Sequence, residues 1–263
     1  MIFSKSLPVK IVLVGTGGTG GYIVPQLYRL LCSLNRHIRV ILCDGDLVEP
    51  KNLVRQNFIE ADIGLNKAKV LAERYSSAFG IETSYIPQYI ESEDFLEDLL
   101  EPMKIQTGRT IRNKHGVFTL EEVKELVILI GAVDNNRTRA VFHHVFQRAD
   151  NLIYLDAGNS KTNGQVICGI RRNGKTSYQP VASLYPEVLE ITDKFPTELS
   201  CAEASISAPQ TIAANLTAAT IVTIHIFNIL AEGNNHSVEK SVFSTNSVKI
   251  QSFKKDRKRR NAA

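Results

Sequence analysis

The sequence predicts a doubly wound α/β fold, with a mostly parallel sheet and helices on both of its faces. Two observations lead to this prediction. Strand-like and helix-like segments alternate from residue 10 to residue 155, which is typical of parallel strands joined by helices. A run of glycines follows the first strand directly and opens the first helix, as in nucleotide-binding folds of this class.

Each element is predicted from its pattern of apolar residues. A β-branched run at 10–14 leads into the glycine turn 15–21, and apolar residues at helical spacing predict a helix over 22–34. Further strands are predicted at 39–43, 82–86, 125–132, 152–155 and 165–170, and helices at 66–79, 93–100, 136–149 and 209–230. Residues 47–65 are predicted to form a polar loop, and 238–252 a weak terminal strand or hairpin.

The chain is predicted to form one domain over 1–253. Residues 101–117 are polar, basic and aperiodic, which predicts an insertion outside the core. Residues 171–208 contain several prolines and are interpreted as a long crossing segment. A chain of 263 residues buries enough surface to fold without disulfides or a structural metal.

The net positive charge of the chain comes from its C-terminal segment. Residues 254–260 carry six bases and one acid, a charge of +5, which leaves about −1 on the rest of a chain whose net charge is +4. The segment 254–263 is predicted to be a disordered basic tail. A contact between this tail and nucleic acid stays open.

The spacing of the cysteines predicts the cellular compartment. None of the four cysteines forms a CxxC pair, which argues against a structural zinc site and a disulfide framework and predicts a cytoplasmic protein. Residues 211–230 contain several polar side chains, so we expect a helix in the core or at a subunit interface and no membrane span.

The glycine turn is the first candidate site. Gly15, Gly17, Gly18 and Gly20 let backbone amides approach a phosphate, and the start of the following helix attracts negative charge. Asp44, at the end of the second strand, is placed to bind a ribose hydroxyl. Taken alone, this pattern is typical of a dinucleotide site.

The loop after the second strand points to a different nucleotide. It runs Asp-Gly-Asp-Leu-Val-Glu-Pro-Lys-Asn-Leu-Val-Arg-Gln-Asn-Phe from Asp44 and is followed by a Gly-Leu-Asn-Lys stretch that ends at Lys67. Arg55 and Lys67 bring two positive charges to the glycine turn. Two such charges suit a triphosphate better than a pyrophosphate already held by amides.

These motifs together resemble the ThiF/MoeB/HesA family of ubiquitin-like-protein activating enzymes. The matching patterns are GxGGxG, DxDxVExxNLxRQxF, GxxK and a strand that ends in Asp-Asn. The resemblance covers residues 8–170 well and extends more loosely to 230. The chain is similar in length to proteins of the compact branch of this family, which lack zinc-binding CxxC pairs and include the ThiF proteins of the PRTRC system.

The resemblance implies ATP-dependent adenylation of the C-terminal carboxylate of a small β-grasp protein, with Mg²⁺ and in a homodimer. It implies that Arg55, Lys67 and Asp134 are catalytic and that Asp134 binds the metal. The nucleotide-binding residues that it implies are Gly15, Gly17, Gly18, Gly20, Asp44, Asp46, Asn52, Arg55, Gln56, Lys67 and Asn135. Arg139 matches the last position of the family's DNxxxR pattern, and Cys201 lies where some members accept the acyl group.

Several alternatives stay open. The chain could adenylate a small molecule or a tRNA base, or bind a nucleotide as a scaffold without catalysis. An NAD-dependent oxidoreductase is the remaining alternative, and the pair of cations argues against it. Members of the family carry an N-terminal helix with an arginine that reaches into the ATP site of the partner subunit. We expect no such helix before the first strand of this chain.

Overall fold

The computed structural model describes residues 6–112, 114, 116–190, 193–199, 210–232 and 238–254. One nine-stranded sheet organises the molecule, in the order β11-β10-β8-β7-β6-β1-β2-β3, with β9 paired to β8. Its strands are β1 (Val9–Val14), β2 (Ile38–Cys43), β3 (Glu82–Ile86), β6 (Leu126–Gly131), β7 (Leu152–Asn159), β8 (Asn163–Arg172), β9 (Lys175–Tyr178), β10 (Val238–Ser244) and β11 (Lys249–Lys254).

The sheet has a parallel half and an antiparallel half. Strands β3, β2, β1, β6 and β7 run parallel, so their carboxyl ends meet at one edge. Strands β8, β9, β10 and β11 continue the sheet in antiparallel pairs. The predicted mostly parallel α/β fold is therefore confirmed, and residues 238–252 lie in the β10–β11 hairpin.

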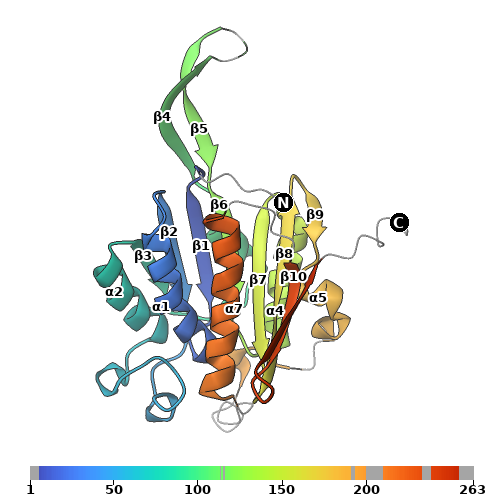
Figure 1. Ribbon diagram of the computed structural model, residues 1–263. Helices are drawn as coiled ribbons and strands as arrows, with labels where there is room; N and C mark the ends of the chain where they lie inside the picture. The colour runs from blue at the N-terminus through green and yellow to red at the C-terminus, as the bar shows by residue number, and fades with distance from the viewer. Residues whose placement is uncertain are drawn as a thin grey trace.

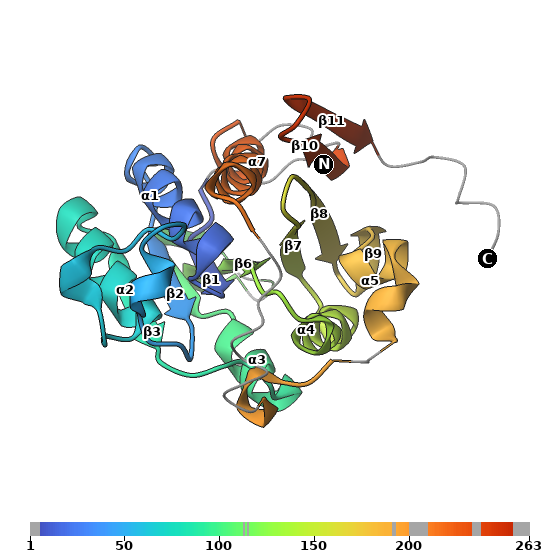
Figure 2. The same cartoon turned by 90° about the horizontal axis from the view of Figure 1, so that it is seen from below.

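Helices cover both faces of the sheet (Figure 2). Helices α1, α2 and α7 pack on one face, and α3, α4 and the short α5 pack on the other. Their bounds are α1 (Gly18–Cys32), α2 (Lys67–Phe79), α3 (Glu93–Leu100), α4 (Asn136–Arg148), α5 (Val181–Leu184) and α7 (Ile212–Leu230). Within the described ranges, 3₁₀ turns at Pro50–Asn52, Glu60–Asp62, Pro186–Leu189 and Pro196–Glu198 lie in the connections.

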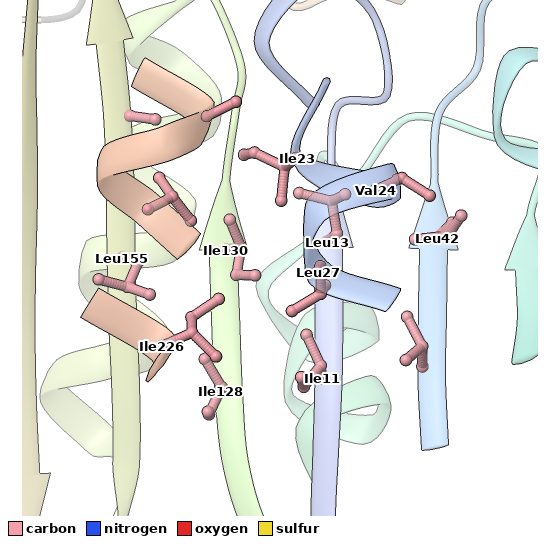
Figure 3. Packing of buried hydrophobic residues seen from close by; sticks show 14 of the residues in the cluster. Ile11, Leu13, Ile23, Val24, Leu27, Leu42, Ile128, Ile130, Leu155 and Ile226 are labelled. Carbon is pink, nitrogen blue, oxygen red and sulfur yellow. The ribbon is translucent and has the colours of Figure 1, made fainter. Parts of the chain in front are cut away.

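The larger core lies between the sheet and the α1–α7 layer. Its side chains come from the central strands and from the inward faces of both helices (Figure 3). They include Ile11, Leu13, Ile23, Val24, Leu27, Leu42, Ile128, Ile130, Leu155 and Ile226. Because this core fixes α1 and α7 against the same strands, it also fixes the starts of both helices at the carboxyl edge of the sheet.

Helix α7 is the long apolar helix that the sequence predicts, and it begins at Ile212 rather than 209. By length and composition it could cross a membrane, and it packs against α1, β7 and β8. Its outer face still exposes a stripe of apolar side chains. These are Ile212, Leu216, Ile224 and Phe227, each between 39% and 49% exposed.

The segment 101–117, predicted as an insertion outside the core, is largely exposed where the structure describes it, but the strand that it contains was not predicted. Residues 104–124 form a hairpin of β4 (Lys104–Arg112) and β5 (Phe118–Lys124), which projects from the end of the sheet opposite the carboxyl edge (Figure 1). A register shift between Gln106 and Thr110, with Gly108 at φ +75°, breaks the alternation of side chains and hides the strand from a periodicity argument.

A buried ion pair holds the root of this hairpin. The guanidinium of Arg39 donates to Glu125 at 2.6 Å and 2.8 Å, and the backbone N–H of Met103 donates to the same carboxylate at 2.8 Å. The ammonium of Lys10 donates to the carbonyl of Glu101 at 2.9 Å. Both ends of the hairpin are therefore tied to the central strands β1 and β2.

Candidate functional site

A cavity of about 890 Å³ lies at the carboxyl edge of the parallel strands. It is the place where a ligand is expected in an open α/β sheet. Residues that follow β1, β2, β6 and β7 line it, together with the starts of α1, α2 and α4. Eleven predicted site residues line the cavity: Gly15, Gly17, Gly18, Asp44, Asp46, Asn52, Arg55, Gln56, Lys67, Asp134 and Asn135.

The glycine turn packs closely against its surroundings. Gly15 has φ +86°, and a side-chain Cβ there would lie 2.5 Å from the carbonyl oxygen of Ala132. A Cβ on Gly20 would lie 1.8 Å from the carbonyl oxygen of Gly15. Gly20 therefore closes the turn against the helix, while Gly17 and Gly18 line the cavity.

Asp44 is buried beneath the glycine turn. Its Oδ2 accepts from the backbone N–H of Thr16 at 2.6 Å and from the hydroxyl of Thr16 at 3.0 Å. Its Oδ1 accepts from the backbone N–H of Asp46 at 2.9 Å. Burial raises the pKa of Asp44, against the lowering effect of Lys67. Asp44 thus connects the ends of β1 and β2 and lines the cavity where the sequence predicts a ribose contact.

Lys67 is brought to the cavity by the start of α2. The side chain of Asn66 caps this helix, accepting from the backbone N–H of Lys69 at 3.0 Å, and donates to the carbonyl oxygen of Asp44 at 2.8 Å. The ammonium of Lys67 donates to Oδ2 of Asp46 at 2.7 Å. The hydroxyl of Tyr89 donates to the other oxygen of Asp46. The lysine is 5% exposed.

Asn52, Arg55 and Gln56 come from the loop that the sequence singles out. Asn52 is buried and shapes the loop, because its Oδ1 accepts from the backbone N–H of Glu49 at 2.9 Å. Gln56 is also buried, and its Oε1 has no hydrogen-bond partner among the described residues. Arg55 has no acidic partner within the described ranges, and its Nη1 lies 3.5 Å from Oε1 of Gln210. This guanidinium is therefore available to an anionic ligand.

Asp134 and Asn135 lie at the start of α4. Asp134 is exposed in the cavity, and Asn135 caps the helix by accepting from the backbone N–H of Thr138 at 2.8 Å. Arg139 holds this loop through two hydrogen bonds. Its Nη2 donates to the carbonyl of Val133 at 2.5 Å, and its Nη1 donates to the side chain of Asn136 at 3.3 Å.

Asp156 is a site residue that the sequence reasoning missed. Its carboxylate is 1% exposed, and its two oxygens lie 3.3 Å and 3.2 Å from Nε of Arg139. The hydroxyl of Tyr154 donates to Oδ2 of Asp156 at 2.8 Å. The sequence contains a signal for it, because Asp156 directly follows the apolar run 152–155 as Asp44 follows the apolar run 40–43, although in the structure Asp156 lies within β7. Tyr89 and Asn215 were missed as well, and no local pattern marks them.

Two of the three cysteines within the described residues, Cys43 and Cys168, are buried, and the third, Cys32, is exposed at the end of α1. Cys43 lines the cavity, but burial and the neighbouring Asp44 raise the pKa of its thiol. Burial likewise raises the pKa of Cys168. Because the thiolate is the reactive form, neither side chain is set up to accept an acyl group. Cys201 lies outside the described residues, as does the tail beyond Lys254, which itself ends β11.

The cavity suits a magnesium ion that arrives with a nucleotide. Among the described residues no group of three or more His, Cys, Asp or Glu side chains could hold a metal. Mg²⁺ is usually bound by one or two carboxylates together with substrate phosphates and water. Asp134, an exposed carboxylate that lines the cavity together with the glycine turn, fits that mode.

The fold has solved relatives. MccB of E. coli with ATP matches with a TM-score of 0.60 and 18% identity, covering 95% of this chain and 64% of that chain. The microcin C7 biosynthetic enzyme MccB in complex with N-formylated MccA matches with a TM-score of 0.64 and 17% identity, covering 95% and 65%. A structure of PaaA matches with a TM-score of 0.61 and 15% identity, covering 94% and 64%. This chain thus spans just under two-thirds of their length.

The family comparison covers almost the whole chain. No curated protein matches significantly. The ThiF family model, in contrast, matches residues 4–263. The glycine turn, the Asp44 loop and the Asp134 region all lie within that match and line one cavity. The chain therefore belongs to the ThiF family.

Proposed function

We propose that the protein adenylates a carboxylate with ATP. The observation that carries this proposal is that Arg55, Lys67 and the exposed carboxylate of Asp134 line one cavity with the glycine turn. A dinucleotide site of this fold needs only the turn and the ribose-binding acid. The added charges match a triphosphate whose leaving group gains negative charge.

The proposed reaction is a displacement at the α-phosphorus of ATP. A substrate carboxylate oxygen forms a bond to that phosphorus, and the bond from phosphorus to the bridging oxygen breaks. Pyrophosphate leaves with the electron pair, and the product is an acyl-adenylate. Arg55 and Lys67 stabilise the charge that builds on the leaving group, and the turn amides orient the phosphates. Asp134 would hold Mg²⁺, which supplies further charge neutralisation.

We propose the C-terminal carboxylate of a small ubiquitin-like protein as the substrate. The lining of the cavity also includes neutral amide side chains, those of Asn159, Gln165 and Gln210. Neutral donors and acceptors suit the end of a polypeptide backbone better than a charged small molecule. Solved MccB structures contain MccA, which supports a polypeptide substrate for this fold.

Two further features belong to this proposal. The apolar stripe on α7 supports a homodimer, because exposed apolar side chains in a row are typical of subunit interfaces. The absence of CxxC pairs from the sequence supports placement in the compact branch that includes the PRTRC-system proteins. In this proposal the protein is cytoplasmic, and Cys201 is the candidate acceptor after adenylation.

The test is ATP–pyrophosphate exchange with the full chain. Candidate ubiquitin-like proteins with a free C-terminus are compared with the same proteins amidated at the C-terminus. Exchange that needs the free carboxylate supports the proposal. Exchange that occurs with a small carboxylic acid or a tRNA instead, or ATP binding without any exchange, would replace it with one of the alternatives.

A further inference from the structure

The start of α7 contacts the nucleotide site through a polar side chain in an otherwise apolar helix. Asn215 is completely buried, and its neighbours on the same face of α7 are Ala214, Ala218 and Ala219. A buried carboxamide needs hydrogen-bond partners to offset the loss of water. Among the described residues, the hydrogen-bond partners of the Asn215 side chain come from elements of the candidate site.

These partners form a directed chain of hydrogen bonds. The hydroxyl of Thr19, in the first turn of α1, donates to Oδ1 of Asn159 at 2.9 Å. Nδ2 of Asn159 donates to Oδ1 of Asn215 at 2.9 Å, and Nδ2 of Asn215 lies 3.4 Å from the carbonyl oxygen of Arg55, its acceptor. The chain links α1, β7, α7 and the Arg55 loop.

Arg55 is held by α7 at a second point. Gln210, two residues before the helix, lies with its Oε1 3.5 Å from Nη1 of Arg55. The helix start also abuts the phosphate turn, because a Cβ on Gly18 would lie 2.6 Å from Nδ2 of Asn215 and 2.8 Å from Oε1 of Gln210. Asn215 therefore ties the Arg55 loop to the glycine turn from the side of α7, while Nδ2 of Asn57 ties the same loop to the carbonyl oxygen of Gly21 at 3.0 Å.

We propose that Asn215 is a positioning residue for ATP: it holds Arg55 at the distance from the glycine turn that the phosphates require. This inference rests on the proposed function. Asn215 itself makes no contact with the ligand in this account. It acts through the backbone of Arg55 and through Thr19, and its loss lets the arginine loop move away from the turn.

The experiment is a double-mutant cycle read by calorimetric ATP binding to the full chain. Asn215→Ala is expected to raise the Kd for ATP about tenfold. In an Arg55→Ala background, the same substitution is expected to raise Kd by less than about threefold, because the residue it positions is gone. Equal effects in both backgrounds would overturn the proposal, as would an unchanged Kd in Asn215→Ala.

Controls separate positioning from general stability. Val222→Ala truncates a completely buried side chain two turns along the same helix, and it is expected to lower the melting temperature and leave the Kd unchanged. If Asn215→Ala does not fold, Asn215→Asp keeps the size of the side chain and its Oδ1 acceptor but removes the Nδ2 donor to the carbonyl oxygen of Arg55, and it is expected to raise Kd. A folded Asn215→Asp protein with wild-type affinity would then overturn the proposal.

The two claims fail in different ways. If the wild-type chain does not bind ATP, the proposed function is wrong. If the wild-type chain binds ATP and Arg55→Ala weakens that binding, while Asn215→Ala does not, only the positioning role is wrong.

Discussion

The ammonium of Lys67 donates to the carboxylate of Asp46 across 2.7 Å, so the lysine assigned to the phosphates is ion-paired before they arrive. Lys67 is almost fully buried, whereas the side chain of Asp46 is 47% exposed. An incoming phosphate therefore has to share this lysine with Asp46. The pair keeps a buried cation at the cavity without leaving it uncompensated.

The pair predicts a stability change in acid. Burial by itself would raise the pKa of Asp46, but the charge and hydrogen bond of Lys67 outweigh it, and the pKa lies below its ordinary value of 3.8. The stabilisation is present above that value and is lost as pH falls through the lowered pKa. Asp46→Asn should therefore be less stable than wild type at pH 6, and the difference should shrink below pH 4. Urea unfolding at each pH measures it, and a difference that does not change with pH would contradict the account.

We predict a large loss of stability when the ion pair between Arg139 and Asp156 is broken. Asp156 is buried and the side chain of Arg139 is only 13% exposed, and removal of one member of a buried ion pair costs about 3–5 kcal/mol. Arg139→Met should lower the free energy of unfolding by that amount in urea. Asp134→Asn, at an exposed position next to the same helix, should change it by less than about 0.5 kcal/mol. Similar losses in the two variants would show that Arg139 is not the anchor of the Asp134 loop.

The glycine turn predicts opposite outcomes for two alanine variants. Gly20→Ala places a methyl group 1.8 Å from a backbone oxygen and should prevent folding or distort the turn. Gly17→Ala meets nothing closer than 3.6 Å, the side chain of Gln56, so it should fold normally. Its methyl group lies at the cavity and should weaken ATP binding. Circular dichroism and calorimetry distinguish the two, and a folded Gly20→Ala protein that binds ATP would contradict this reading of the turn.

Lys10 predicts a gain of stability in base. Burial, followed by the charge of Arg39, lowers the pKa of Lys10 from 10.5 to about 8. Between those values the unfolded chain binds a proton that the folded chain does not, so stability rises with pH. Wild type should gain about 1–3 kcal/mol relative to Lys10→Met from pH 8 to pH 10.5. A constant difference between the two proteins over that interval would show that Lys10 titrates normally.

The fold could be predicted from the sequence because its signals are local. The parallel strands β1, β2, β6 and β7 contain short apolar runs, and helices such as α1 and α4 show their own periodicity. The position of the cavity could also be predicted, because residues that follow parallel strands lie together at one edge of the sheet. Asp44 and Asp134 are examples. The hairpin 104–124 could not be predicted, because the register shift near Gly108 removes the alternation on which such an argument depends.

The rest of the site depends on contacts between distant segments. Asn215 lies 160 residues from Arg55 in the sequence, and nothing near it in the chain marks it as a polar site residue. The same holds for Tyr89, whose contact with Asp46 depends on how the end of β3 lies beside the end of β2. Such residues are found only once the packing of helices and strands is known.

The central claim is that this cavity forms an acyl-adenylate from ATP, and ATP–pyrophosphate exchange tests it most directly. The wild-type chain with a carboxylate-ended protein substrate should exchange labelled pyrophosphate into ATP. Asp134→Ala should still fold and should lose exchange by at least about a hundredfold, because the charge on the leaving group is no longer neutralised. Exchange at the wild-type rate in Asp134→Ala would contradict the account.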